Sequence, residues 1–78
     1  LGKASSIDQV KNSKTPILYI HGDQDDFVPY YMMEKLYNAT SSEKEMLTIK
    51  GAEHAKASEV DPITYWTTVN NFINKYIN

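Results

Sequence analysis

Two short segments of the sequence carry the side chains best suited to chemistry. Residues 21–26 read His-Gly-Asp-Gln-Asp-Asp and place three carboxylates directly after an apolar run. Residues 51–55 read Gly-Ala-Glu-His-Ala and set His54 among small residues that leave room for a substrate. An aspartate that accepts a hydrogen bond from a histidine fixes the ring's tautomer and stabilises the imidazolium formed during acyl transfer. The aspartates of the first segment, Asp25 among them, and His54 are therefore candidates for the acid and the base of a hydrolytic site.

Taken singly, each of these segments also has an ordinary structural interpretation. Aspartates are common in turns and near helix N-termini, and a single histidine is most often an exposed loop residue. A calcium loop is disfavoured because Phe27 and Val28 stand where the EF-hand pattern needs oxygen ligands. We expect no metal or cofactor, and we expect His21, at the end of the apolar run, to pack or bond locally.

The hydrophobic pattern predicts alternating strands and helices. Short apolar runs predict strands at residues 16–20, buried on both faces, and at residues 45–49. Helical spacing of apolar residues predicts helices at residues 29–40 and from residue 61 to the chain end. Residues 1–14 are polar and predict a loop or linker with at most one helical turn.

This order predicts an α/β fold with parallel strands, because strands that alternate with helices are joined by crossovers. Ligands bind at the carboxyl ends of the strands in such sheets. The loops that hold Asp25 and His54 would emerge side by side there, if the strands are neighbours. We expect Trp66 to lie in the core.

Length, charge and hydropathy limit the kinds of partner that the chain can have. The chain has 78 residues, no cysteine and a net charge of −2 with mixed signs, and no basic patch suggests nucleic acid. No apolar run is long enough to span a membrane, and we expect a cytoplasmic protein. The first residue is leucine, and two strands cannot cover the apolar helix faces. We therefore expect a piece of a longer chain, and a homodimer when this piece is alone.

The two loops together resemble the α/β-hydrolase superfamily over residues 15–77. The acid-loop pattern H-G-x-x-D-x-x-V-P and the histidine-loop pattern G-x-x-H are matched by His21, Gly22, Asp25, Val28, Pro29, Gly51 and His54. The Asp-Pro-x-x-Tyr-Trp start of the last helix is similar to that of bacterial serine esterases and prolyl-oligopeptidase-like enzymes. Acid before histidine is also the chain order of the superfamily.

The resemblance implies that residues 15–78 are the last two β-α units of a serine hydrolase. Asp25 would be its triad acid and His54 its triad base, acting on a small ester or a peptide-like substrate. The superfamily's G-x-S-x-G nucleophile motif is absent from this chain, so we expect the chain to be inactive alone. The motif would lie roughly 80–120 residues upstream of Asp25. The alternative is a non-catalytic α/β assembly or binding module.

A small flavodoxin-like binding domain is also disfavoured, because it would need a glycine-rich phosphate-binding loop after an early strand. The three glycines of the chain form no such loop.

Overall fold

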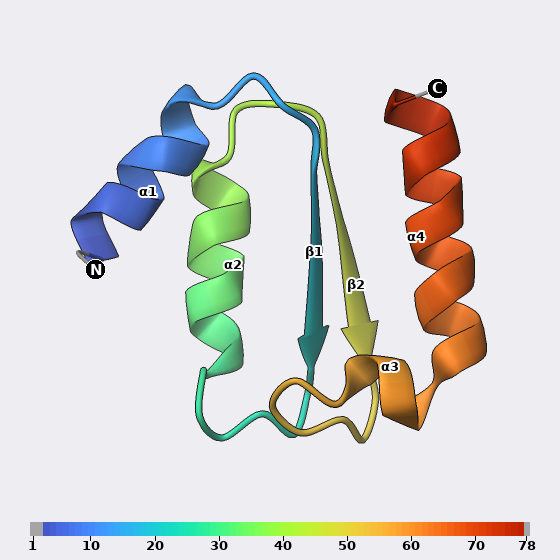
Figure 1. Cartoon of the computed structure of the whole chain (residues 1–78). Helices are drawn as coiled ribbons and strands as arrows, with labels where there is room; N and C mark the ends of the chain where they lie inside the picture. Colours follow the sequence, from blue (N-terminus) through green and yellow to red (C-terminus); the bar gives the residue numbers. More distant parts are fainter. Residues whose placement is uncertain (1–2, 78) are drawn as a thin grey trace.

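A computed structural model describes residues 3–77, with the side chains of residues 6–77. The elements run in the order α1 (Lys3–Asn12), β1 (Ile17–Gly22), α2 (Tyr30–Ala39), β2 (Lys44–Ile49), α3 (Ala57–Val60) and α4 (Pro62–Tyr76). The fold is α/β, as the sequence predicted. Figure 1 shows α2 on one side of the two strands and α4 on the other, with α1 beside α2.

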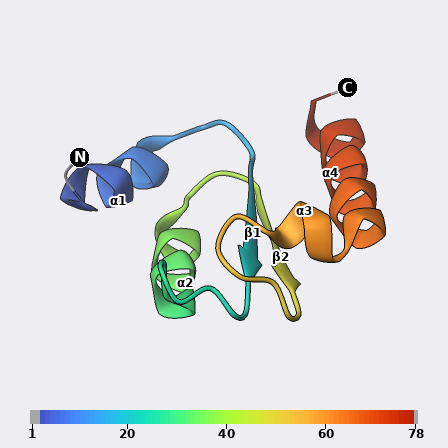
Figure 2. The same cartoon turned by 60° about the horizontal axis from the view of Figure 1, so that its bottom comes forward.

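The two strands are parallel neighbours. Their register runs from Ile17 opposite Lys44 to Gly22 opposite Ile49, so both strands end at the same edge of the sheet. Figures 1 and 2 place the loop after β1, the loop after β2 and α3 together at that edge. The fold therefore brings together the two segments that the sequence singled out for chemistry.

Residues 3–12 form a helix where the sequence predicted mainly loop, and that prediction was wrong. Only Ile7 and Val10 suggested an apolar face, which is too weak a pattern to predict a helix. The end of α1 is held by residue 41, whose backbone N–H donates to Val10 O at 3.4 Å. The hydroxyl of Ser41 also donates to Lys11 O at 2.6 Å. Tertiary contacts of this kind override a weak local preference.

Helix α4 begins where the sequence predicted, because the side chain of Asp61 accepts a hydrogen bond from the backbone N–H of Thr64 at 3.1 Å and Pro62 follows it. Phe72 is buried, whereas Trp66 is 53% exposed. The prediction of a core position for Trp66 was wrong. The apolar face of α4 is wide, and the sheet covers only one side of it.

Strand β1 is less covered than predicted. Residues 17–20 are half-buried, and only His21 and Gly22 of this strand are buried. The sheet within residues 3–77 has two strands, so the outer edge of each strand has no sheet neighbour there. No helix in this part of the chain combines the length and the apolar character needed to cross a membrane.

Candidate active site

The turn after β1 presses directly against the loop after β2. A Cβ atom on Gly22 would stand 2.1 Å from the carbonyl oxygen of Ala52, so only glycine permits this approach. The backbone N–H of Gln24 donates to the same oxygen at 3.0 Å. We call residues 23–29 the acid loop and residues 50–56 the histidine loop. Their backbones are in direct contact before any site side chain is considered.

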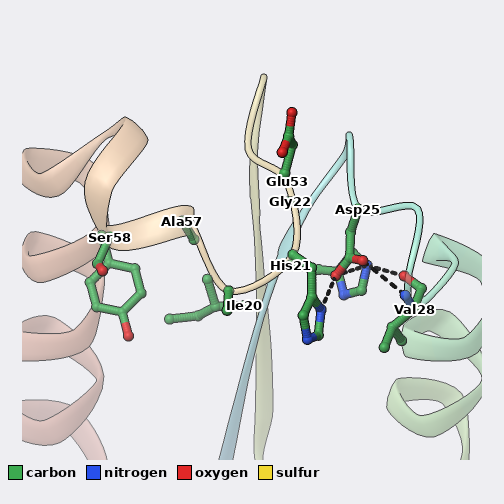
Figure 3. Close-up of a pocket in the computed structure, with 11 residues that line it drawn as sticks. Ile20, His21, Gly22, Asp25, Val28, Glu53, Ala57 and Ser58 are labelled. Carbon is green, nitrogen blue, oxygen red and sulfur yellow. Dashed lines mark hydrogen bonds and ion pairs between the residues drawn. The ribbon is translucent and has the colours of Figure 1, made fainter.

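The carboxylate of Asp25 is fixed by its own loop. Its Oδ1 atom accepts hydrogen bonds from the backbone N–H groups of Phe27 at 2.9 Å and Val28 at 2.8 Å. Two backbone donors on one oxygen define the rotation of the carboxylate, so that Oδ2 faces the other way. The side chain is only 5% exposed, and Figure 3 shows it among the residues that line a pocket.

The Oδ2 atom of Asp25 lies 2.9 Å from Nδ1 of His54. A carboxylate only accepts, so Nδ1 carries the proton and donates it. This is the contact that the sequence predicted for an intact parent protein, and it is present in this chain. Because it uses Nδ1, the Nε2 edge of the ring is left for another group. The His54 side chain is 48% exposed.

The surroundings of Asp25 lower its pKa below the ordinary aspartate value of 3.8. Burial alone would raise the pKa, and it is the largest single influence. It is outweighed by the sum of the hydrogen bonds from Val28, His54 and Phe27 and the attraction of the His54 ring. Asp25 is therefore ionised at neutral pH, which an acceptor facing an imidazole N–H requires.

The histidine loop turns sharply on both sides of its imidazole. Gly51 has φ of +84° and Ala55 has φ of +60°, both in the left-handed region that L side chains rarely adopt. The ring of Phe27 lies 4.9 Å from the His54 ring, centroid to centroid. Phe27 is itself 76% exposed, so an apolar surface stands beside the imidazole at the open side of the site.

The other carboxylates of the two loops point elsewhere. Asp23 accepts a hydrogen bond from the backbone N–H of Gly51 at 2.7 Å, and Asp26 is exposed. The side chain of Glu53 points away from Asp25 in Figure 3. Of these carboxylates, Asp25 is the one that faces the imidazole.

A hollow of about 460 Å³ opens beside this pair. Its walls come from the end of β1, both loops, α3 and α4, the last through Tyr65. A hollow shared by so many elements offers space for a further group next to His54. Among residues 3–77, no cluster of three or more His, Asp or Glu side chains could hold a metal ion.

Sequence reasoning did not connect His21 with the site. Its Nε2 atom lies 2.8 Å from Val28 O and 3.6 Å from Asp25 Oδ2. The expected local bonding is correct, but its partner is the loop that holds the candidate acid. The one signal in the sequence was its place in the H-G-x-x-D pattern, four residues before Asp25.

Comparison with known proteins gives a family for this arrangement. The model of the prolyl oligopeptidase family matches residues 2–78. The chain is also 28% identical over 72 residues to the uncharacterized protein YqkD of Bacillus subtilis (strain 168). That match covers 92% of this chain but 24% of YqkD, so the chain spans about a quarter of the curated relative. No solved structure matches.

The family match covers nearly the whole chain, including both loops of the site. It confirms the resemblance to α/β-hydrolases and agrees with a parallel α/β arrangement. The chain belongs to the prolyl oligopeptidase family, a family of hydrolases.

Proposed function

We propose that this chain is the acid- and base-bearing part of a longer serine hydrolase. Asp25 serves as its triad acid and His54 as its triad base. The substrate class is a small ester or a peptide-like acyl compound. The observation that carries the proposal is the 2.9 Å contact between Asp25 Oδ2 and His54 Nδ1 at neighbouring strand ends.

In this mechanism each atom of the pair has one task. The ionised carboxylate of Asp25 accepts the Nδ1 proton, which keeps Nε2 of His54 unprotonated and able to accept the proton of a serine hydroxyl. As the serine oxygen attacks the acyl carbon, Asp25 stabilises the imidazolium that results. Nε2 then returns the proton to the leaving group, and water hydrolyses the acyl-enzyme with the same base.

The nucleophile has to come from outside these residues. None of the serines in the chain is flanked by glycines in the G-x-S-x-G pattern, which places the nucleophile of such enzymes on a strand-to-helix turn. A hollow next to His54 is the space that such a turn requires. The chain alone is therefore inactive in this proposal.

The test is hydrolysis of a chromogenic ester and a chromogenic peptide amide by the full-length protein. His54→Ala should remove nearly all turnover, roughly a 10⁶-fold loss of kcat as for other triad bases. Asp25→Asn should lower kcat by about 10⁴-fold with little change in the fold, because the amide supports the wrong tautomer. Asp26→Asn is the matched control, since this exposed neighbour faces solvent, and should keep full activity.

The losses of turnover in these variants distinguish a serine hydrolase from a non-catalytic protein. A non-catalytic α/β assembly or binding module would show no hydrolysis that depends on His54. Turnover by His54→Ala at the wild-type rate would therefore contradict the proposed role, whichever substrate is used. Equal losses in Asp25→Asn and Asp26→Asn would contradict the choice of Asp25 as the acid.

A further inference from the structure

The second histidine of the chain is buried beneath the acid loop. His21 is the last but one residue of β1 and is 8% exposed. Its ring meets the edge of the Tyr30 ring, with centroids 5.8 Å apart and planes at 78°. The hydroxyl of Tyr30 is itself bonded to Oγ1 of Thr48 at 2.8 Å. The His21 ring is thus held between a strand end and the first residue of α2.

The hydrogen bond made by His21 defines its tautomer. A backbone carbonyl only accepts, so the 2.8 Å contact with Val28 O requires the proton on Nε2 of His21. The backbone N–H of Val28 donates to Asp25 Oδ1 at 2.8 Å. Residue 28 is therefore held at its carbonyl by His21 and at its N–H by the carboxylate of Asp25.

The same nitrogen also approaches the functional oxygen of the acid. Nε2 of His21 lies 3.6 Å from Asp25 Oδ2, the atom that accepts from His54. That distance is too long for a hydrogen bond, and the proton is directed to Val28 O.

We propose that His21 is a positioning residue that acts through Val28 and Asp25 to hold the carboxylate on Nδ1 of His54. This inference rests on the proposed function, because it supplies the support that the candidate acid needs. The chain of contacts runs from His21 Nε2 to Val28 O, from Val28 N to Asp25 Oδ1, and from Asp25 Oδ2 to His54 Nδ1. His21 itself touches neither the nucleophile nor the substrate in this scheme.

The proposed role requires an N–H donor at the position of His21 Nε2 and does not require an aromatic ring. Glutamine at position 21 carries an amide nitrogen the same number of bonds from the backbone and can donate to Val28 O. Leucine fills similar space without a donor. His21→Gln and His21→Leu therefore separate the hydrogen bond from the packing of the ring. If the leucine variant is not recovered folded, His21→Asn replaces it, because its amide is one methylene too short to reach Val28.

The experiment compares these variants in the full-length protein by chromogenic ester hydrolysis. We expect His21→Leu to lower kcat by roughly 10²-fold, the scale of a small misplacement of a catalytic group, with KM unchanged. His21→Gln should restore most of kcat. Tyr19→Phe is the matched control. It removes the part-buried hydrogen bond between the Tyr19 hydroxyl and Thr40, which lies at the other end of α2 from the acid loop, and it should leave kcat intact.

Two further measurements bear on the route of the effect. In the Asp25→Asn background, His21→Leu should cause almost no additional loss, because a residue that acts through Asp25 has nothing left to position. The hydrogen-bonded Nδ1 proton of His54 should give a downfield proton NMR signal in the wild type and His21→Gln proteins, and this signal should be lost in His21→Leu.

The His21 variants test the positioning role of His21, and the His54→Ala variant tests the proposed catalytic function separately. Wild-type kcat in His21→Leu, equal losses in the leucine and glutamine variants, or fully additive losses with Asp25→Asn would each overturn the positioning role. The NMR signal does not depend on turnover, so its persistence in His21→Leu would overturn the role even if His54 proved non-catalytic. Failure of the proposed function is read separately, from undiminished turnover by His54→Ala.

Discussion

The carboxylate of Asp23 accepts a hydrogen bond from the backbone N–H of Gly51 at 2.7 Å and so joins the acid loop to the histidine loop. We predict that Asp23→Ala loosens the two loops and lowers both kcat and stability, the latter by about 1 kcal/mol. Asp23→Asn keeps an Oδ1 acceptor and should retain most of both. Urea unfolding and ester hydrolysis of the full-length variants measure the two effects. Matching losses in the alanine and asparagine variants would show that charge, rather than this bond, is what Asp23 contributes.

Gly22 and Gly51 are both special positions, but for different reasons. A Cβ on Gly22 would collide with the backbone of Ala52 at 2.1 Å, whereas one on Gly51 would meet nothing within 4 Å and suffers only from the φ of +84°. We predict that Gly51→Ala costs about 1–2 kcal/mol, the ordinary penalty of left-handed backbone. Gly22→Ala should cost more and should also reduce kcat, because the loops must move apart. Thermal unfolding of the two variants ranks them, and the reverse ranking would contradict this account of the loop contact.

Asp25 should titrate below pH 3.8, because its hydrogen bonds and the His54 ring together lower its pKa. A depressed folded-state pKa makes a stabilising contribution that is complete above about pH 3.8 and is lost as the pH falls through the folded value. We predict that the stability difference between wild type and Asp25→Asn shrinks in that acidic range. The carboxyl carbon NMR shift of Asp25 follows the titration directly. In His54→Ala the midpoint should move upward, and an unchanged midpoint would mean that the contact contributes nothing to the ionised form.

The 78-residue chain by itself should form a homodimer in solution. Helix α4 and its C-cap residue expose Ile63, Trp66 and Ile77, at 79%, 53% and 61%. The outer strand edges have no neighbours within residues 3–77. Sedimentation at micromolar concentration should give about twice the 8.9 kDa chain mass. Trp66→Lys should shift the chain toward monomer, whereas Thr67→Lys adds the same charge at an exposed polar position next to it and should shift it less. A wild-type monomer would contradict the prediction.

The order of the main elements could be read from the sequence because local and tertiary preferences agree there. The strand predicted at residues 16–20 begins within one residue of β1, which continues two residues further to Gly22. Asp61 with Pro62 marks the start of α4, and this boundary was predicted closely. The predictions failed where apolar residues were too few to define a helix, or where they covered too wide a face of a helix to show which side is buried. The end of α1 is held by contacts with residue 41. The exposure of Trp66 depends on how much of α4 the two-stranded sheet can cover.

The candidate pair was predictable because parallel strands fix where loops emerge, and the two loops follow neighbouring strands. The choice of Asp25 among the aspartates came from the resemblance and not from the physics of the loop. The contact of His21 with the acid loop could not be predicted beyond its place in the H-G-x-x-D pattern, since it depends on the direction of one carbonyl, Val28 O. The close approach of Gly22 to Ala52 likewise exists only in three dimensions.

The half-exposed indole of Trp66 gives this protein an internal optical probe. It is the only tryptophan of the chain, and it is exposed on α4, whereas Phe72 of the same helix is buried. Indole emission shifts to shorter wavelengths when water is excluded from the ring, so any surface that covers α4 changes the colour of the fluorescence without a label. The tyrosines absorb at shorter wavelength, and excitation at the red edge selects the indole. A titration of emission against concentration would therefore report the covering of this one helix, separately from events at the pair of loops.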